Sequence, residues 1–299
     1  MDMLKITNLK KRFGDKEVLK DVSLSVPEHS VFGFIGKNGA GKTTTMKTIL
    51  GLMAADEGEI LVAGEKVSYG QTKTNRYIGY LPDVPEFYGY MTPYEYLTFC
   101  GKITGMPKEI IKKRSLELLK LVGLSEEKHR IKGFSRGMKQ RLGIAQALLN
   151  KPKLLICDEP TSALDPVGRK EILDILMAVK QETTVIFSTH ILSDVERICT
   201  DVAFLNDGKI VTQGKISEIK EMNKSKDILL EFENLKDANK VLGAFTECSV
   251  MENSRLIFKG KEERLFEIFR FIADNEINVN KIERMERTLE SLFLEVAGE

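Results

Sequence analysis

The chain has 299 residues, 42% of them hydrophobic, and its 45 basic and 44 acidic residues leave a formal net charge of +1. This balance disfavours a nucleic-acid-binding tail and a polybasic membrane anchor, so we expect no nucleic-acid partner. Four widely spaced cysteines match neither a metal spacing nor a disulfide framework, and no apolar run approaches the roughly 20 residues of a membrane-spanning helix or forms a signal peptide.

The first part of the chain alternates strand and helix signals. Short strands with a turn are expected within residues 1–26, where apolar and polar residues alternate. An apolar run at 31–35 ends in a glycine-rich loop, and a helix is expected at 43–52. Further strands are expected within 58–81. The phosphate-binding loops of nucleotide-binding proteins occur in this context of strand, glycine loop and helix.

The middle of the chain continues the alternation after a turn-rich stretch at 82–93. Helical character extends to about residue 124, and another helix is expected from 135 to about 150. Short apolar runs at 154–157 and 185–188 are typical of buried strands. Strands that alternate with helices in this way predict an α/β sheet with a substantial parallel part.

A charged stretch at 220–226 predicts a linker between a first domain, residues 1–220, and a second, residues 227–299. The second domain shows the order βαββαβ, which predicts a small α+β, ferredoxin-like module. It contains no catalytic constellation, so we expect an accessory, dimerising or regulatory role. A last amphipathic helix is expected from the apolar face formed by Leu289, Leu292, Phe293 and Val296.

Residues 36–43 have the pattern of a Walker A phosphate loop. Backbone N–H groups of such a loop converge on phosphate oxygens, and the following helix N-terminus favours their negative charge. Lys42 would bring a positive charge to the β- and γ-phosphates, and the Thr43 hydroxyl would bind Mg²⁺. A chance glycine turn is the alternative, which the flanking strand and helix disfavour. The nucleotide-binding residues expected here are Gly36, Lys37, Asn38, Gly39, Ala40, Gly41, Lys42, Thr43 and the adjoining Thr44.

Residues 154–159 form an apolar strand that ends in two carboxylates, a Walker B pattern. Asp158 would hold Mg²⁺ through water, and Glu159 would act as the general base for the attacking water. A strand that ends in Asp-Glu often marks only a strand edge. Downstream of a phosphate loop, the catalytic interpretation is favoured, with ATP and Mg²⁺ as the expected cofactors.

Residues 134–141 resemble the signature motif of ABC transporter ATPases, which usually reads LSGGQ. Residues 162–165 resemble the D-loop of that family, and His190 matches its switch histidine. The motifs stand in the family order, and the ending at 288–295 resembles the drug- and antibiotic-exporter type. The resemblance implies a P-loop NTPase of the ABC ATPase type, with a helical subdomain at about 84–150.

The same resemblance assigns roles to residues outside the phosphate loop. Ser135 and Gly137 would bind the γ-phosphate of ATP held by the other protomer, and Asp165 would lie beside the dimer interface. His190 would contact the γ-phosphate and orient the water. Phe13 stands where the family stacks an aromatic ring on adenine, although packing in the core is an alternative for this ring.

Two motifs depart from the family pattern. The signature motif has Arg136 and Met138 where Gly and Gln are usual, and Asp83 stands where a Gln usually reaches Mg²⁺ and the attacking water. Asp83 would still be able to bind Mg²⁺, but it adds a negative charge near the phosphates. This change leaves the rate of hydrolysis open.

As a family member, the chain would form a head-to-tail homodimer around two ATP molecules and energise a membrane exporter. The helical subdomain would dock onto a separate permease subunit, with residues 85–90 as an aromatic partner surface or, alternatively, a local aromatic cluster. We therefore expect a cytoplasmic protein, peripheral on the inner face of the cell membrane. A soluble ATPase acting on ribosomes or DNA and a nucleotide-sensing regulator are the alternatives. Soluble ATPases of that kind usually have two ATPase cassettes in one chain or long insertions. A nucleotide-sensing regulator, which binds ATP but barely hydrolyses it, stays an alternative because of Asp83.

Overall fold

The computed structural model describes residues 2–71, 73–222, 227–285 and 289. Its internal contacts divide the chain into two compact units, which we call the N-terminal unit (Met1–Ser217) and the C-terminal unit (Glu218–Glu299). Of the linker predicted at 220–226, residues 223–226 lie outside the described residues. Each unit contains a hydrophobic core of its own, as expected of separate domains.

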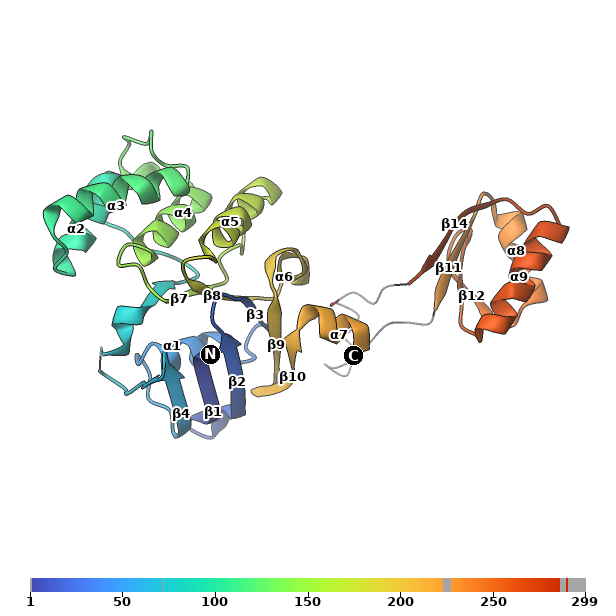
Figure 1. Ribbon diagram of the computed structural model, residues 1–299, viewed down its shortest axis with the longest axis horizontal. Helices are drawn as coiled ribbons and strands as arrows, with labels where there is room; N and C mark the ends of the chain where they lie inside the picture. Colours follow the sequence, from blue (N-terminus) through green and yellow to red (C-terminus); the bar gives the residue numbers. More distant parts are fainter. Residues whose placement is uncertain (1, 72, 223–226, 286–288, 290–299) are drawn as a thin grey trace. The chain divides into compact units, whose positions relative to one another are not determined.

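A six-stranded, mostly parallel sheet forms the centre of the N-terminal unit (Figure 1). Its strands follow the order β10-β9-β3-β8-β7-β6, and only β10 runs antiparallel to its neighbour. Strands β3, β7 and β8 are buried along their whole length because apolar runs of this kind are covered on both faces. The strands are β3 (Val31–Ile35), β6 (Ile78–Leu81), β7 (Leu154–Asp158), β8 (Thr184–Thr189), β9 (Asp201–Asn206) and β10 (Lys209–Lys215).

A second, antiparallel sheet has the strand order β2-β1-β4-β5, and its first two strands are longer than the short strands predicted within 1–26. The outer part of β1 lacks apolar alternation but is held by ion pairs to the first residue of β4 and to the residue before it. Lys10 reaches Glu57 at 2.6 Å, and Lys11 reaches Asp56 at 2.8 Å. The strands are β1 (Asp2–Phe13), β2 (Lys16–Pro27), β4 (Glu57–Val62) and β5 (Glu65–Lys66).

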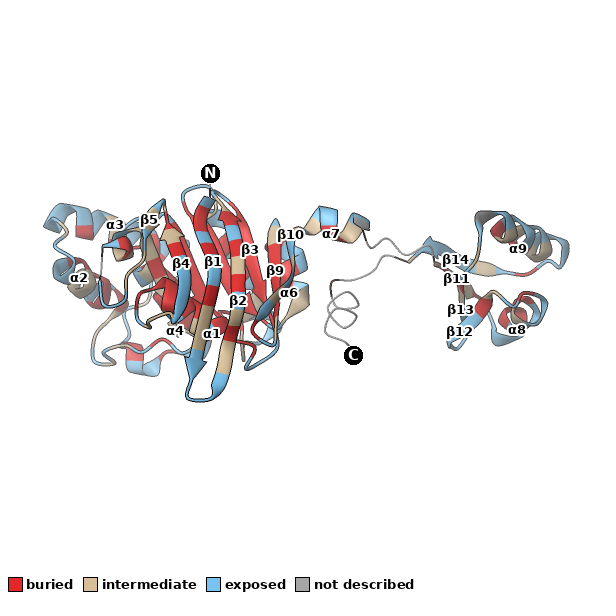
Figure 2. Cartoon of the chain, turned by 90° about the horizontal axis from the view of Figure 1, so that it is seen from below, coloured by how far each residue is buried: buried red, intermediate tan, exposed pale blue. Residues whose placement is uncertain are grey.

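Helix α1 (Lys42–Ile49) joins the two sheets into one core. Its buried Met46 and Ile49 belong to the same hydrophobic cluster as Leu4 of β1 and Ile156 of β7. Figure 2 shows this core as the band of buried residues along β1, β3 and β4. The phosphate loop is therefore fixed at the junction of the two sheets, directly before a helix that both sheets hold.

Further helices gather around the parallel sheet, and α2, α3 and α4 lie together at one end of the N-terminal unit (Figure 1). Helix α2 begins with a capping box, in which Thr92 and Glu95 satisfy each other's backbone N–H groups. No helix among the described residues is long and apolar enough to cross a membrane. The helices are η1 (Thr74–Tyr77), α2 (Pro93–Ile103), α3 (Lys108–Leu121), η2 (Ile131–Gly133), α4 (Arg136–Ala147), α5 (Pro166–Val179) and α6 (Leu192–Ile198). Helix α7 (Ile216–Met222) contains the boundary between the two units.

The C-terminal unit has the predicted order βαββαβ, with an antiparallel sheet of order β12-β13-β11-β14. Leu230 and Phe232 of β11 face a core that includes Val241 of α8 and Ile268 of α9. Of the predicted last helix, only Leu289 is among the described residues. The elements are β11 (Ile228–Phe232), α8 (Leu235–Ala244), β12 (Cys248–Glu252), β13 (Arg255–Phe258), α9 (Glu262–Asp274) and β14 (Val279–Arg284).

Candidate functional site

The predicted phosphate loop lies between the end of β3 and the start of α1, and it curls around its own lysine. The buried Lys42 Nζ donates to the carbonyl oxygen of Gly36 at 2.6 Å and to that of Lys37 at 3.3 Å. Gly41 caps the helix with a φ of 113°, a left-handed conformation that L side chains rarely adopt. A Cβ at Gly41 would also lie 2.7 Å from the Leu19 side chain. Glycine is therefore required at this position by both backbone geometry and space.

The two carboxylates predicted at the end of β7 have different surroundings. Asp158 is buried and accepts hydrogen bonds from Thr43 Oγ1 at 2.9 Å and from Ser188 Oγ at 2.6 Å. Ser188 also accepts from the backbone N–H of Glu159 at 3.1 Å. The sequence interpretation gave Ser188 no role. Its place at the end of an apolar run was the available signal, because the carboxyl ends of adjacent parallel strands lie together.

Glu159 contacts Lys42 and His190, the other two residues predicted to be catalytic. One carboxylate oxygen lies 3.1 Å from Lys42 Nζ, and the other lies 2.9 Å from Nδ1 of His190. The backbone of Glu159 has a φ of 48°, in the left-handed region, and strain of this kind clusters at functional sites. The turn after β7 therefore presents this carboxylate toward the phosphate loop.

A cavity of about 380 Å³ brings the loop and these side chains together. The sequence interpretation predicted most of its lining but not Val18 or Ser162. The full lining consists of Val18, Asn38, Gly39, Gly41, Lys42, Thr43, Thr44, Asp83, Asp158, Glu159, Ser162 and His190. Residues that are far apart in sequence therefore converge on one hollow with a phosphate loop at its floor.

The side-chain oxygens at the cavity fit a magnesium ion whose coordination shell is completed by the substrate phosphates and water. Among the described residues, no three His, Cys, Asp or Glu side chains gather as a metal site of their own. Mg²⁺ commonly takes one or two protein oxygens and fills its octahedron with phosphates and water, so Thr43 and Asp158 suffice. Burial raises the pKa of Tyr80 to about 12, and the charge of Asp158 adds to this rise. The carboxylate of Asp158 and the hydroxyl of Thr43 are oxygen ligands of the kind that Mg²⁺ prefers.

Seven predicted nucleotide-site residues do not line this cavity. They are Gly36, Lys37 and Ala40 of the phosphate loop, and Phe13, Ser135, Gly137 and Asp165 elsewhere in the N-terminal unit. Ser135 caps α4 and accepts from the N–H of Met138 at 3.2 Å, with Gly137 in the first turn of that helix. Asp165 caps α5 in the same way. Phe13, at the end of β1, is 48% exposed, so the alternative of core packing is wrong for this ring. Phe13, Ser135 and Asp165 are exposed and are therefore accessible to a nucleotide or to a partner chain.

The two departures from the family pattern contact each other. Arg136 Nη2 lies 3.0 Å from Oδ1 of Asp83, and the buried Gln140 donates to the carbonyl oxygen of Asp83 at 2.6 Å. The sequence interpretation treated these departures separately. Nothing in a single sequence indicates that positions 83 and 136 are neighbours.

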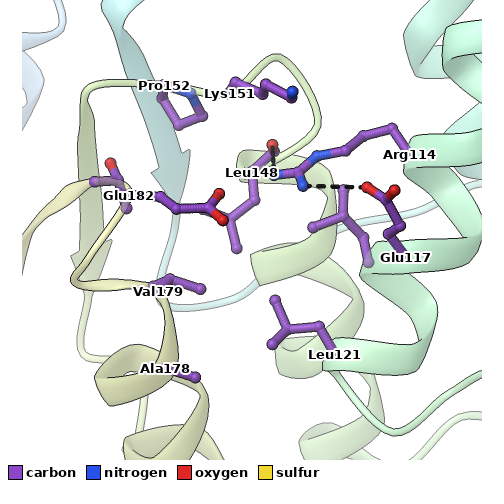
Figure 3. A pocket seen from close by; sticks show the side chains of 11 residues that line it. Arg114, Glu117, Leu121, Leu148, Lys151, Pro152, Ala178, Val179 and Glu182 are labelled. Carbon is purple, nitrogen blue, oxygen red and sulfur yellow. Dashed lines mark hydrogen bonds and ion pairs between the residues drawn. The ribbon is translucent and has the colours of Figure 1, made fainter.

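A larger cavity, of about 560 Å³, lies between α3, the end of α5 and the segment that joins α4 to β7, and it lacks the features of a phosphate site (Figure 3). Arg114 donates to the carbonyl oxygen of Leu148 at 3.3 Å and lies 3.6 Å from the Glu117 carboxylate. Lys151 and Glu182 add one charge of each sign to the lining. With its charges balanced, this cavity offers no surplus positive charge to a triphosphate.

Comparison with known proteins places the chain in a family. Residues 19–162 match the sequence profile of a family described as ABC transporter. The chain is 38% identical over 304 residues to the uncharacterized ABC transporter ATP-binding protein YxlF of Bacillus subtilis, covering 98% of this chain and 99% of the relative. It is 35% identical over 311 residues to the bacitracin transport ATP-binding protein BcrA of Bacillus licheniformis, with coverages of 99% and 97%.

A solved structure supports the same assignment. That of cbiO1 from Clostridium perfringens, part of the ABC transporter complex cbiONQ, matches with a TM-score of 0.69 and 28% identity over 74% of this chain and 92% of that chain. The fold and family predicted from the motifs are therefore confirmed. The chain belongs to the ATP-binding proteins of ABC transporters, a family of ATPases.

Proposed function

We propose that this chain is the energy-coupling subunit of a membrane exporter of the drug and antibiotic type, and that it hydrolyses ATP at the cavity above the phosphate loop. The observation that carries this proposal is the contact of Glu159 with both Lys42 and His190 at the cavity wall. A base, a cation for phosphate and an orienting histidine are the groups that in-line attack of water on a γ-phosphate requires. The bacitracin transport relative supports the exporter type.

The steps follow from the contacts of these residues. The loop N–H groups and Lys42 receive the β- and γ-phosphates. Because Lys42 lies 3.1 Å from the Glu159 carboxylate, the incoming γ-phosphate competes with that carboxylate for the same cation. Binding therefore releases Glu159, which then takes a proton from the attacking water while His190 holds the water in line. Thr43 and Asp158 would hold Mg²⁺, and the ion would neutralise charge that develops on the phosphates.

Two copies of the chain would complete each site. Ser135 and Asp165 are exposed, cap the helices α4 and α5 and do not line the cavity of their own chain. Free N–H groups at a helix N-terminus bind phosphate, so the first turn of α4 suits ATP held by a second copy. A head-to-tail homodimer around two ATP molecules brings each α4 to the cavity of the other protomer.

The mass of the Glu159→Gln protein in ATP and Mg²⁺ tests this assembly. The amide preserves shape but removes the base, so bound ATP persists and light scattering should show the mass of a dimer. In this background Ser135→Asp keeps a cap on α4, since Asp accepts the same bond, but repels the partner's phosphate. We expect Ser135→Asp to abolish the dimer. A monomer in Glu159→Gln, or a dimer that Ser135→Asp leaves intact, would contradict the assembly.

A groove of about 440 Å³ near α4 is the proposed docking site for a permease, which would hold the chain at the cytoplasmic face of the membrane. Beside it, Tyr88 packs edge-on against Phe99 at 5.5 Å, yet it remains half exposed, as is Tyr90. The residues at 85–90 thus form both a local aromatic cluster and an exposed surface. The lining consists of Asp83, Val84, Pro85, Glu86, Phe87, Gly89, Ile131, Lys132, Arg136 and Lys139.

Capture of a multi-span membrane protein from detergent-solubilised membranes tests the docking site. Val84→Ser and Tyr90→Ser should reduce that capture and leave ATP affinity unchanged, because neither residue lines the nucleotide cavity. Ile103→Ser, an exposed apolar residue at the end of α2, is the matched control. Capture that survives both substitutions, Val84→Ser in the groove and Tyr90→Ser beside it, would place the partner elsewhere.

A further inference from the structure

The contact between Asp83 and Arg136 joins two parts of the chain that serve different ATP molecules. Asp83 follows β6 and lines the nucleotide cavity of its own chain. Arg136 opens α4, directly after Ser135, which is proposed to contact the ATP of a second copy. Their side chains meet at 3.0 Å and are 49% and 41% exposed. This ion pair replaces two uncharged family residues.

The main chain at Asp83 is fixed independently of this ion pair. Gln140, which is fully buried on α4, donates to the Asp83 carbonyl oxygen at 2.6 Å. Gly143, one turn further, brings α4 against the side chains of Leu81 and Pro85, where a Cβ would lie 2.5 and 3.4 Å from them. With the backbone held on both sides, the freedom left at this position is rotation of the Asp83 side chain.

The direction of the Asp83 carboxylate matters because this residue lines two hollows. It borders the nucleotide cavity, with Thr43 and Asp158, and also the groove near α4. Arg136 lines the groove but not the nucleotide cavity. A carboxylate paired with Arg136 is therefore drawn to the groove side, and one released from it is free to turn toward Thr43 and Asp158.

We propose that Arg136 is a positioning residue that holds the Asp83 carboxylate away from the magnesium position until the ion pair opens. The inference deepens the proposed function and rests on the metal position at Thr43 and Asp158. Exposed ion pairs are weak, so the pair between Asp83 and Arg136 opens easily. Either ATP binding or an anionic side chain in the groove would break it and release the Asp83 carboxylate. Asp is one methylene shorter than Gln, so the released carboxylate reaches the ion through water.

The metal dependence of ATP binding tests this restraint on the full-length chain. ATP affinity is measured in Mn²⁺ and again in EDTA, and the ratio of the two affinities isolates the metal contribution. Arg136→Gln should raise this ratio roughly threefold, within the range of an exposed ion pair. Arg136→Lys should stay near the unchanged protein because it keeps the charge. Lys139→Gln removes a cation from the same groove and should leave the ratio unchanged.

The decisive comparison repeats Arg136→Gln in an Asp83→Asn background. With no carboxylate to release, the substitution should leave the ratio unchanged there. An equal change in both backgrounds, or no change in either, would overturn the inference while leaving the proposed ATPase intact. Failure of the unchanged chain to bind ATP more tightly with Mn²⁺ than with EDTA would instead overturn the proposed metal position, and the inference with it.

Discussion

At the scale of single residues, Lys42 is the group on which the nucleotide site depends. It is buried, its ammonium group donates to two carbonyl oxygens of its own loop, and its charge is matched by Glu159. A buried cation with these partners is held in place before any phosphate arrives, which lowers the entropic cost of binding.

Lys42→Ala should weaken ATP binding by at least about tenfold, because a charge-assisted hydrogen bond is worth roughly 1.5–3 kcal/mol and about 1.4 kcal/mol is a factor of ten. Titration with a fluorescent ATP analogue measures this. Lys47→Ala removes an exposed lysine from the same helix and serves as the control. Unchanged affinity in Lys42→Ala would remove this lysine from the site.

The cysteines provide a second residue-scale test. Burial raises the pKa of the Cys157 and Cys199 thiols, and it raises the pKa of Cys248 to about 11. A raised thiol pKa lowers the thiolate fraction at pH 8, to roughly one in a thousand for a pKa of 11, and the thiolate is the reactive form. Iodoacetamide at pH 8 should therefore label these three residues far more slowly in the native chain than in urea, as measured by mass spectrometry. Equal rates would contradict the burial of Cys157 and Cys248 and the partial burial of Cys199.

At the scale of elements, the packing of α4 against β6 brings together Asp83, which follows β6, and Ser135, which caps α4. A Cβ at Gly79 of β6 would lie 2.2 Å from the carbonyl oxygen of Ala147, at the end of α4. Since that neighbour is backbone, the helix or the strand must move to admit a side chain. The close approach therefore depends on glycine.

Gly79→Ala should destabilise the chain by about 1–3 kcal/mol, the usual cost of overpacking. Gly133→Ala is the matched control, because a Cβ there meets nothing within 4 Å. The midpoint of urea unfolding measures both. A Gly79→Ala midpoint as high as that of Gly133→Ala would mean that α4 and β6 lie further apart than the structure shows.

The strands and site residues of the N-terminal unit show which structural features sequence patterns can predict. The uninterrupted apolar runs of β3, β7 and β8 predicted those strands closely, because a strand buried on both faces leaves a clear signal. The length of β1 was underestimated, since its outer part is held by charged partners and not by apolar alternation. The phosphate loop and the two carboxylates carry local motifs. Gln140 acts only through a neighbour remote in sequence, so no local pattern could identify it. The only local signal for Ser188 was its place at the end of an apolar run.

At the scale of the whole molecule, the chain consists of two units with separate cores. All residues that line the nucleotide cavity belong to the N-terminal unit. The C-terminal unit has the ferredoxin-like order of elements, and we infer that it supports pairing of two chains. ATP binding should therefore survive its removal, whereas dimerisation should not be fully preserved.

A chain that ends at Met222 keeps α7 complete. It tests whether ATP binding depends on the N-terminal unit and dimerisation on the C-terminal unit. Its ATP affinity should equal that of the full chain, and its dimer in ATP should dissociate at lower dilution in sedimentation experiments. A collapse of ATP affinity would show that the C-terminal unit belongs to the ATPase fold. Unchanged affinity and unchanged dimerisation would assign that unit to contact with another protein.

The most direct test of the account compares ATP turnover with ATP affinity in the Glu159→Gln protein and in the unchanged chain. Loss of the general base should reduce phosphate release by at least about a hundredfold. ATP affinity should stay equal or increase, because the amide no longer competes as an anion for Lys42. Phosphate release at an unchanged rate, or a parallel loss of affinity and turnover, would contradict the assignment of Glu159 as the base.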